Sequence, residues 1–178
     1  MKLILIGGRA RSGKDTFADY LYDELVKEDK KVCKIQISQY IKYYATKYFG
    51  WDGSEETKPR DLLQHLGTEI IRNKIDKYFH INRLVQDIKV LSYYYDYFIV
   101  SDVRLPEEIE IPKGEFEDVV SIKLKRESDE LNDAQKLHIT EVGLDNYDDF
   151  DYVIDNSGTL DDLKDEAINL LKKIGDIE

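Results

Sequence analysis

Short apolar runs alternate with amphipathic segments along the whole of this chain. Residues 2–7 (KLILIG) form an apolar run closed by glycines, a pattern typical of a buried strand. Similar runs predict further strands at 32–38, 97–101, 118–125 and 151–155. Apolar residues three or four positions apart predict helices at 14–27, 39–49, 59–77, 80–95 and 160–174. Because strands alternate with helices, we expect an α/β fold: a three-layer sandwich in which a central five-stranded parallel sheet carries helices on both faces.

The length of 178 residues favours a single domain over residues 1–178. Pro106 and Pro112 fall in the segment 105–117, so the helix expected there should be short or broken. The sequence holds no apolar run long enough to span a membrane, and the apolar start before Gly7 is too short for a signal peptide. With Cys33 as the one cysteine, no intramolecular disulfide can form, and a reducing cytoplasm is the expected location.

The charge is unevenly distributed. The formal net charge is −11, which argues against nucleic acid or an anionic membrane as the main partner. Residues 1–100 hold 17 basic and 14 acidic side chains, whereas residues 101–178 hold 9 basic and 23 acidic ones. A basic half within an acidic protein suits a small anionic ligand, although acidic surfaces also simply aid solubility.

The most specific motif lies directly after the first predicted strand. Gly8 and Gly13 are separated by four residues, and Lys14 follows, which is a Walker A (P-loop) pattern. Glycines let backbone N–H groups curl around a phosphate, and the following helix directs its positive end at it. The general pattern has Ser or Thr where this chain has Asp15, so Asp15 could hold Mg²⁺ and Thr16 could reach a phosphate. The alternative is a tight strand-to-helix turn with an exposed lysine.

A second candidate site is the segment Ser101–Arg104. It follows the predicted strand 97–101, so its side chains should emerge at the carboxyl edge of the sheet, where ligands bind in open α/β folds. Asp102 could hold the metal or act as a base, and Arg104 should point to the same side of an extended chain. The alternative is a strand-ending aspartate beside a surface arginine.

The segment ILIGGRARSGKDTFADYL resembles the start of phage-type deoxynucleoside monophosphate kinases and their bacterial relatives, in which Asp follows the loop lysine as it does here. Five further stretches resemble later blocks of that family in the same order: QISQYIK, RDLLQHLGTEIIRNKID, YDYFIVSDVR, HITEVGL and DYVIDNSGTLDDL. The resemblance implies a P-loop kinase fold with an acceptor-binding helical region at about 39–95 and a lid-like segment at about 126–143. It further implies transfer of the γ-phosphoryl group of ATP to a (deoxy)nucleoside 5′-monophosphate, with Mg²⁺.

Together, the motifs and the resemblance predict the following sites. Residues expected to bind ATP are Gly8, Arg11, Ser12, Gly13, Lys14, Asp15, Thr16, Asn156 and Gly158. Residues expected to bind the acceptor are Lys42, Arg60, Gln64, Thr68, Arg104, His138 and Glu141. The residues expected to act in transfer are Lys14, Asp102, Arg104 and Arg126, and those expected to hold the metal are Asp15 and Asp102.

Most of these residues also have a plainer interpretation. Lys42, Arg60 and Arg126 could be ordinary surface cations, and Asn156 and Gly158 could form a simple turn. The aromatic stretch 40–51 is better explained by helix packing than by stacking on a base. The competing functions are a related kinase of the dephospho-coenzyme A or phosphomevalonate type and a module that binds ATP without transfer. The expected partners are small nucleotides, and a homodimer is compatible with the sequence.

Overall fold

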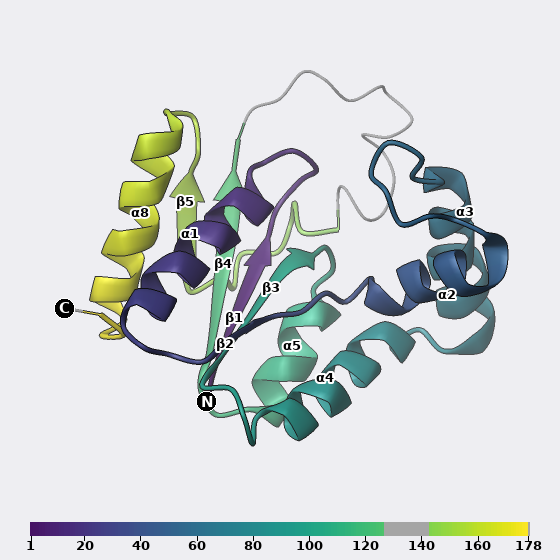
Figure 1. Ribbon diagram of the computed structural model, residues 1–178, viewed down its shortest axis with the longest axis horizontal. Coiled ribbons are helices and arrows are strands. Elements are labelled where there is room, and N and C mark those ends of the chain that lie inside the picture. The colour runs from purple at the N-terminus through teal and green to yellow at the C-terminus, as the bar shows by residue number, and fades with distance from the viewer. Residues whose placement is uncertain (127–142, 178) are drawn as a thin grey trace.

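The computed structural model describes residues 1–126 and 143–177, and a parallel sheet forms its centre (Figure 1). The strands are β1 (Lys2–Gly7), β2 (Val32–Lys34), β3 (Tyr97–Val103), β4 (Val119–Lys125) and β5 (Tyr152–Asp155). Their order is β2-β3-β1-β4-β5, and every neighbouring pair is parallel. The predicted five-stranded parallel sheet is therefore confirmed.

Helices cover both faces of this sheet (Figure 1). On one face lie α1 (Lys14–Lys27) and α8 (Leu160–Lys173), and on the other lie α4 (Phe79–Leu91) and α5 (Glu107–Glu115). The side chains of β1 alternate between the two cores, because successive residues of a strand point to opposite faces. Ile4 and Ile6 join the core under α1 and α8, whereas Leu3 and Leu5 join the core under α4 and α5. This is the predicted three-layer sandwich.

A third group of helices, α2 (Gln39–Phe49), α3 (Arg60–Gln64) and η1 (His65–Ile75), lies beside the sheet (Figure 1). The prediction of one regular helix over 59–77 was wrong, because η1 is a π-helix with i→i+5 hydrogen bonds. Its last turn closes with the Asp76 N–H donating to the Ile71 carbonyl at 2.9 Å. Gly67 allows η1 to approach α2 closely, since a Cβ there would lie 2.7 Å from Ile41 Cδ1.

The helix expected within 105–117 is short, as predicted, because α5 spans nine residues. It is not broken at Pro112, which lies inside the helix and is buried. Among the residues that the structure describes, no helix combines the length and apolar character needed to cross a membrane.

Candidate active site

The loop between β1 and α1 curls into a shape that requires glycine at both of its ends. Gly8 has a φ of +143° and Gly13 a φ of +91°. A Cβ at Gly8 would lie 2.4 Å from the Leu124 carbonyl oxygen, and one at Gly13 would lie 2.4 Å from Asn156 Nδ2. The two glycines of the motif therefore let the loop run against β4 and against the end of β5.

Lys14 opens α1, and its side chain turns back over the loop. It is 7% exposed, and its Nζ donates to the Arg9 carbonyl at 2.6 Å. Ser12 is buried within the loop, with its Oγ 3.5 Å from the same ammonium group. A fixed ammonium beside the N-terminus of a 14-residue helix forms a strongly positive site suited to phosphate.

Asn156 holds the loop from the far side. This buried side chain follows β5, and its Nδ2 donates to the Ser12 carbonyl at 3.0 Å. This hydrogen bond shows that Asn156 anchors the phosphate loop. The contact of Asn156 with ATP stays a prediction. Gly158 is exposed next to the N-terminus of α8, where Thr159 and Asp162 form a reciprocal capping box.

Two contacts at this loop and the start of α1 were not expected from the sequence. Arg9 forms a two-point ion pair with Asp145, in which Nη2 lies 2.6 Å from Oδ2. Ser101, near the end of β3, donates its hydroxyl to Asp15 Oδ1 at 2.6 Å. Both pairs join residues far apart in the sequence, so no local spacing could have indicated them.

Asp15 is exposed at the start of α1, where a carboxylate beside bound phosphates would be a suitable Mg²⁺ ligand. The described residues contain no group of three or more His, Cys, Asp and Glu side chains that could enclose a metal. Mg²⁺ in phosphoryl-transfer sites takes one or two carboxylates and completes its shell with water and phosphates. Asp15 with the hydroxyl of Thr16 fits that requirement.

A cavity of about 380 Å³ opens beside Asp15, with Gln36, Gln39 and Ser101 also among its lining residues. Its volume is in the range of small-ligand sites. A larger hollow of about 580 Å³ includes Met1 and Asp118 and lies at the opposite, amino end of the strands. The smaller cavity is the candidate ligand site, because Asp15 at the start of α1 and Ser101 near the end of β3 both line it.

Asp102 turns away from the phosphate loop toward the connection between β2 and α2. The strand continues through Val103, so Asp102 lies inside β3 rather than after it. Its carboxylate accepts from the Ile37 N–H at 2.9 Å, the Ser38 N–H at 3.0 Å and the Ser38 hydroxyl at 2.7 Å. These hydrogen bonds show that Asp102 anchors the connection between β2 and α2. The roles of Asp102 in metal binding and catalysis stay predictions.

Replacing Asp102 with asparagine should lower the free energy of unfolding by about 2 kcal/mol, because an amide cannot accept all three hydrogen bonds and leaves a part-buried donor unsatisfied. Urea unfolding followed by circular dichroism measures the change. Asp23→Asn, on the exposed side of α1, is the control and should change stability by less than about 0.5 kcal/mol. Equal losses in the two variants would contradict the anchoring role.

Arg104 follows β3 and is held through its backbone by α5. Its N–H donates to Glu108 Oε2 at 2.7 Å, and the Leu105 N–H donates to the same oxygen at 3.1 Å. Arg72 of η1 donates to Glu107 at 2.6 Å and to Glu108 Oε1 at 3.3 Å. Burial raises the pKa of Glu108 to about 7, against the opposing effect of the N–H donors and the Arg72 charge.

His80 is a further buried polar residue near this network. It lies at the start of α4 and is 6% exposed, and neither ring nitrogen has a hydrogen-bond partner of good geometry among the described residues. Burial lowers its pKa, so the neutral ring is favoured. No sequence pattern singled out this histidine, since it lies on the apolar face of a helix.

The predicted acceptor residues are dispersed over the helical group. Lys42 donates to Gln36 Oε1 at 2.6 Å, and Arg60 is an exposed arginine 3.5 Å from Glu55. Gln64 is exposed at the end of α3, and Thr68 is half-buried in η1. Lys42 therefore contacts Gln36, which lines the cavity beside Asp15. Arg60 pairs with Glu55 in the loop before α3, not with a residue of the phosphate loop.

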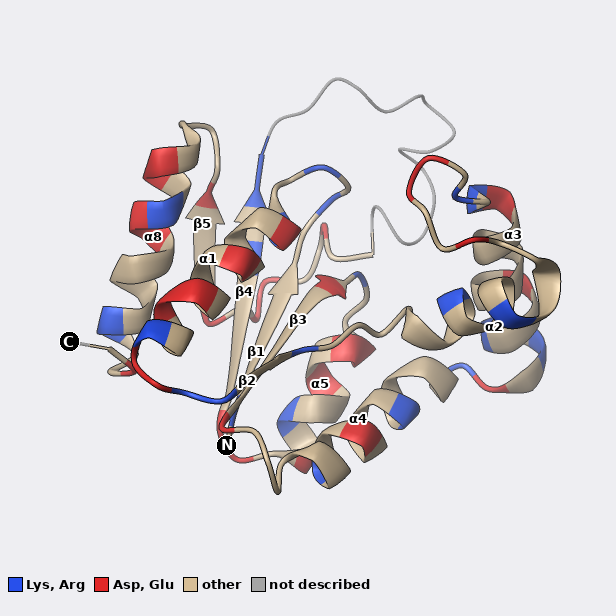
Figure 2. Cartoon of the chain, in the orientation of Figure 1, with Lys and Arg blue, Asp and Glu red and all other residues tan. Residues whose placement is uncertain are grey.

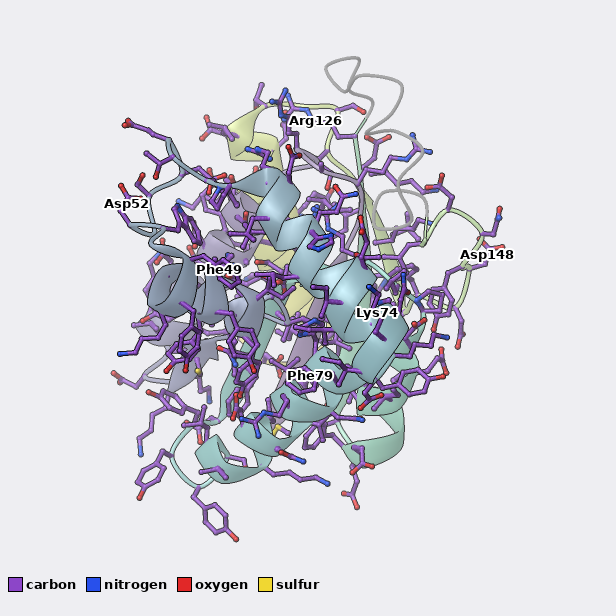
Figure 3. All side chains as sticks on the ribbon, turned by 90° about the vertical axis from the view of Figure 1, so that its right-hand side faces the viewer. Phe49, Asp52, Lys74, Phe79, Arg126 and Asp148 are labelled. Atoms are coloured by element: carbon purple, nitrogen blue, oxygen red, sulfur yellow. The ribbon has the colours of Figure 1, made fainter. Side chains whose placement is uncertain are left out.

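Arg126 follows β4 and is exposed. Figure 3 shows it at the upper end of the molecule, and Figure 1 places the loop between β1 and α1 at that same end. Figure 2 shows basic segments in that loop and at the end of β4. His138 and Glu141, with nearly all of the predicted lid, lie outside the described residues.

The first turn of the parallel sheet is a phosphate loop shaped by two glycines, and a buried lysine opens the next helix. These features define the class of P-loop nucleotide-binding proteins. Solved structures of this class share the fold. APS kinase of Mycobacterium tuberculosis in complex with AMPPNP and APS has a TM-score of 0.58 and 14% identity over 96% of this chain and 97% of that chain. Dephospho-CoA kinase from Campylobacter jejuni has a TM-score of 0.56 and 15% identity over 97% of both chains.

Within that class, the chain belongs to the deoxynucleotide monophosphate kinase family, whose family model matches residues 32–167. The deoxynucleotide monophosphate kinase of Enterobacteria phage T4 is 34% identical over 114 residues, 64% of this chain and 45% of that protein. The enzyme of the same name from Escherichia phage RB69 is 29% identical over 114 residues, 64% of this chain and 44% of that protein. The matched part spans a little under half the length of these two relatives.

Proposed function

We propose that this chain transfers the γ-phosphoryl group of ATP to a deoxynucleoside 5′-monophosphate and releases ADP and the diphosphate. The observation that carries the proposal is the position of Lys14, a buried ammonium held over a glycine loop in a chain of the deoxynucleotide monophosphate kinase family. Phosphoryl transfer depends on positioning and on neutralising charge, and this loop offers both.

The donor nucleotide is assigned to the loop. The backbone N–H groups of residues 8–13 and the start of α1 surround the phosphates, and Lys14 compensates their charge. Asn156 and Asp145 keep the loop in shape through Ser12 and Arg9. Mg²⁺, when bound, would supply positive charge that offsets the negative charge of the phosphates. Asp15 is the side chain best placed to hold it.

The acceptor is assigned to the cavity between α1 and the end of β2, and to the helical group beside it. Arg104 comes from the carboxyl end of β3, where a cation could hold the acceptor phosphate. Arg126 lies at the corresponding end of β4 and is assigned to the charge on the transferred group. The proposal thus includes ATP as the donor, Mg²⁺ as the metal, and the roles of Arg104 and Arg126 in binding phosphate.

The test is ADP release with ATP and Mg²⁺ over a panel of acceptors. The panel contains the four deoxynucleoside and four ribonucleoside monophosphates, with dephospho-coenzyme A as an acceptor of another class. We expect turnover with at least one deoxynucleoside monophosphate, and its loss in Lys14→Ala. Turnover with dephospho-coenzyme A alone, or binding of ATP without transfer to any acceptor, would contradict the proposal.

A further inference from the structure

Glu108 uses each oxygen of its carboxylate for a different part of the molecule. Oε2 accepts from two successive backbone N–H groups, those of Arg104 and Leu105. Oε1 accepts from the guanidinium of Arg72 on η1. The side chain is 7% exposed, so these contacts form away from solvent.

Arg72 reaches this carboxylate from the helical group beside the sheet. The Arg72 side chain is 13% exposed, and its Nη1 donates to Glu107 Oε1 at 2.6 Å. Glu107 is more open, with 18% of its side chain exposed, and it also lies 3.6 Å from Lys77 Nζ. Of the two glutamates, Glu108 alone joins Arg72 to the backbone at the end of β3.

The element that carries Arg72 has unusual geometry. η1 keeps π-helical hydrogen bonding through 11 residues, whereas π-helices elsewhere are mostly single turns found near functional sites. η1 lies close to α2 at Gly67, where a Cβ would lie 2.7 Å from Ile41 Cδ1, and it also contacts α3 and α4. A shift of η1 would therefore act on Arg72 and, through Glu108, on the backbone of Arg104.

The cost of burying these charges supports a role beyond stability. An ion pair in the interior is often no more stabilising than apolar residues of the same volume, because both charges lose their hydration. An apolar residue at 108 could fill the space, but it could not accept from two backbone N–H groups. The carboxylate thus meets a requirement of the β3–α5 connection that packing alone cannot meet.

We propose that Glu108 is a positioning residue that holds the backbone of Arg104 and, through Arg72, ties it to η1. The inference rests on the proposed function, which assigns Arg104 and the helical group to the acceptor. It predicts that loss of this tie impairs use of the acceptor and leaves the binding of ATP intact, because the phosphate loop is anchored independently by Asn156 and Asp145.

Glu108→Gln tests this directly, with Glu107→Gln as the matched control. The amide oxygen at 108 can still accept from the backbone, but the tie to Arg72 is lost, because an amide NH₂ group would face the guanidinium. The value of kcat/KM for the deoxynucleoside monophosphate should fall at least about tenfold, since displacements near 1 Å cost up to about a hundredfold. The KM for ATP should change less than about twofold. Glu107→Gln should change either constant less than about threefold, because the backbone N–H groups of Arg104 and Leu105 donate to Glu108 and not to Glu107.

A second readout does not depend on turnover. Hydrogen exchange measured by NMR should be faster at the Arg104 and Leu105 amides in Glu108→Gln, because a neutral amide oxygen is a weaker acceptor than a carboxylate and is no longer held by Arg72. Exchange at these amides should be unchanged in Glu107→Gln. Equal kinetics in the two variants, or parallel losses for ATP and acceptor, would overturn the inference. A wild-type chain that phosphorylates no monophosphate would instead refute the proposed function, and the inference would fall with it.

If Glu108→Gln does not fold, the double variant Arg72→Met, Glu108→Gln replaces it. This variant leaves neither Arg72 nor Glu108 as an unpaired buried charge and keeps an oxygen for the two N–H groups. The same split between acceptor and ATP kinetics is expected, because η1 is no longer tied to residue 108. A double variant with wild-type acceptor kinetics would overturn the inference.

Discussion

Replacing Lys14 with alanine is expected to lower kcat by about 10²- to 10³-fold while the fold is retained. The ammonium is held by the Arg9 carbonyl at 2.6 Å, so it is positioned before any nucleotide binds. Such a preorganised charge stabilises the transferring phosphoryl group without reorganisation during the reaction. ADP release under saturating ATP and acceptor measures the loss, and circular dichroism confirms the fold.

Lys27→Ala is the control for this prediction. It removes a lysine from the last turn of the same helix, where Nζ lies 2.7 Å from Glu24 and the side chain is 61% exposed. Activity should change less than about twofold, because an exposed ion pair of this kind contributes little. If Lys14→Ala kept half of the wild-type kcat, Lys14 would not be part of the transfer site.

The parts of the site that sequence patterns predicted are those determined by local geometry. The apolar run before Gly8 and the amphipathic segment after Lys14 place the loop between a strand and a helix, and the structure confirms this arrangement. The spacing of the two glycines indicated a tight loop, and their positive φ angles agree. Each of these features depends on fewer than 30 consecutive residues.

The parts that were missed depend on contacts between distant segments. Arg72 and Glu108 are 36 residues apart, and Asn156 and Ser12 are 144 apart, so neither pair has a periodic signal. The π-helix was missed because its apolar residues also fit a regular helix. The contacts of Asp102 with Ser38 were not expected, because they depend on how β2 pairs with β3, and the metal role of Asp102 stays a prediction.

Gly8→Ala is expected to lower the free energy of unfolding by about 2–3 kcal/mol. A φ of +143° disfavours any side chain, and the new Cβ would lie 2.4 Å from the Leu124 carbonyl oxygen. That oxygen belongs to the backbone of β4, which lies between β1 and β5 in the sheet, so it cannot move aside without disturbing both pairings. Urea unfolding followed by circular dichroism measures the loss.

Gly114→Ala is the matched control, and its effect should have the opposite sign. Gly114 lies in α5, a Cβ added there would have no neighbouring atom within 4 Å, and its φ is not in the left-handed region. Alanine there should raise the free energy of unfolding by about 0.5–1 kcal/mol, because it loses less conformational entropy than glycine in a helix. A Gly8→Ala variant as stable as wild type would mean that the loop does not run against β4. Since that contact shapes the phosphate site, ATP affinity should fall together with stability in Gly8→Ala and stay constant in Gly114→Ala.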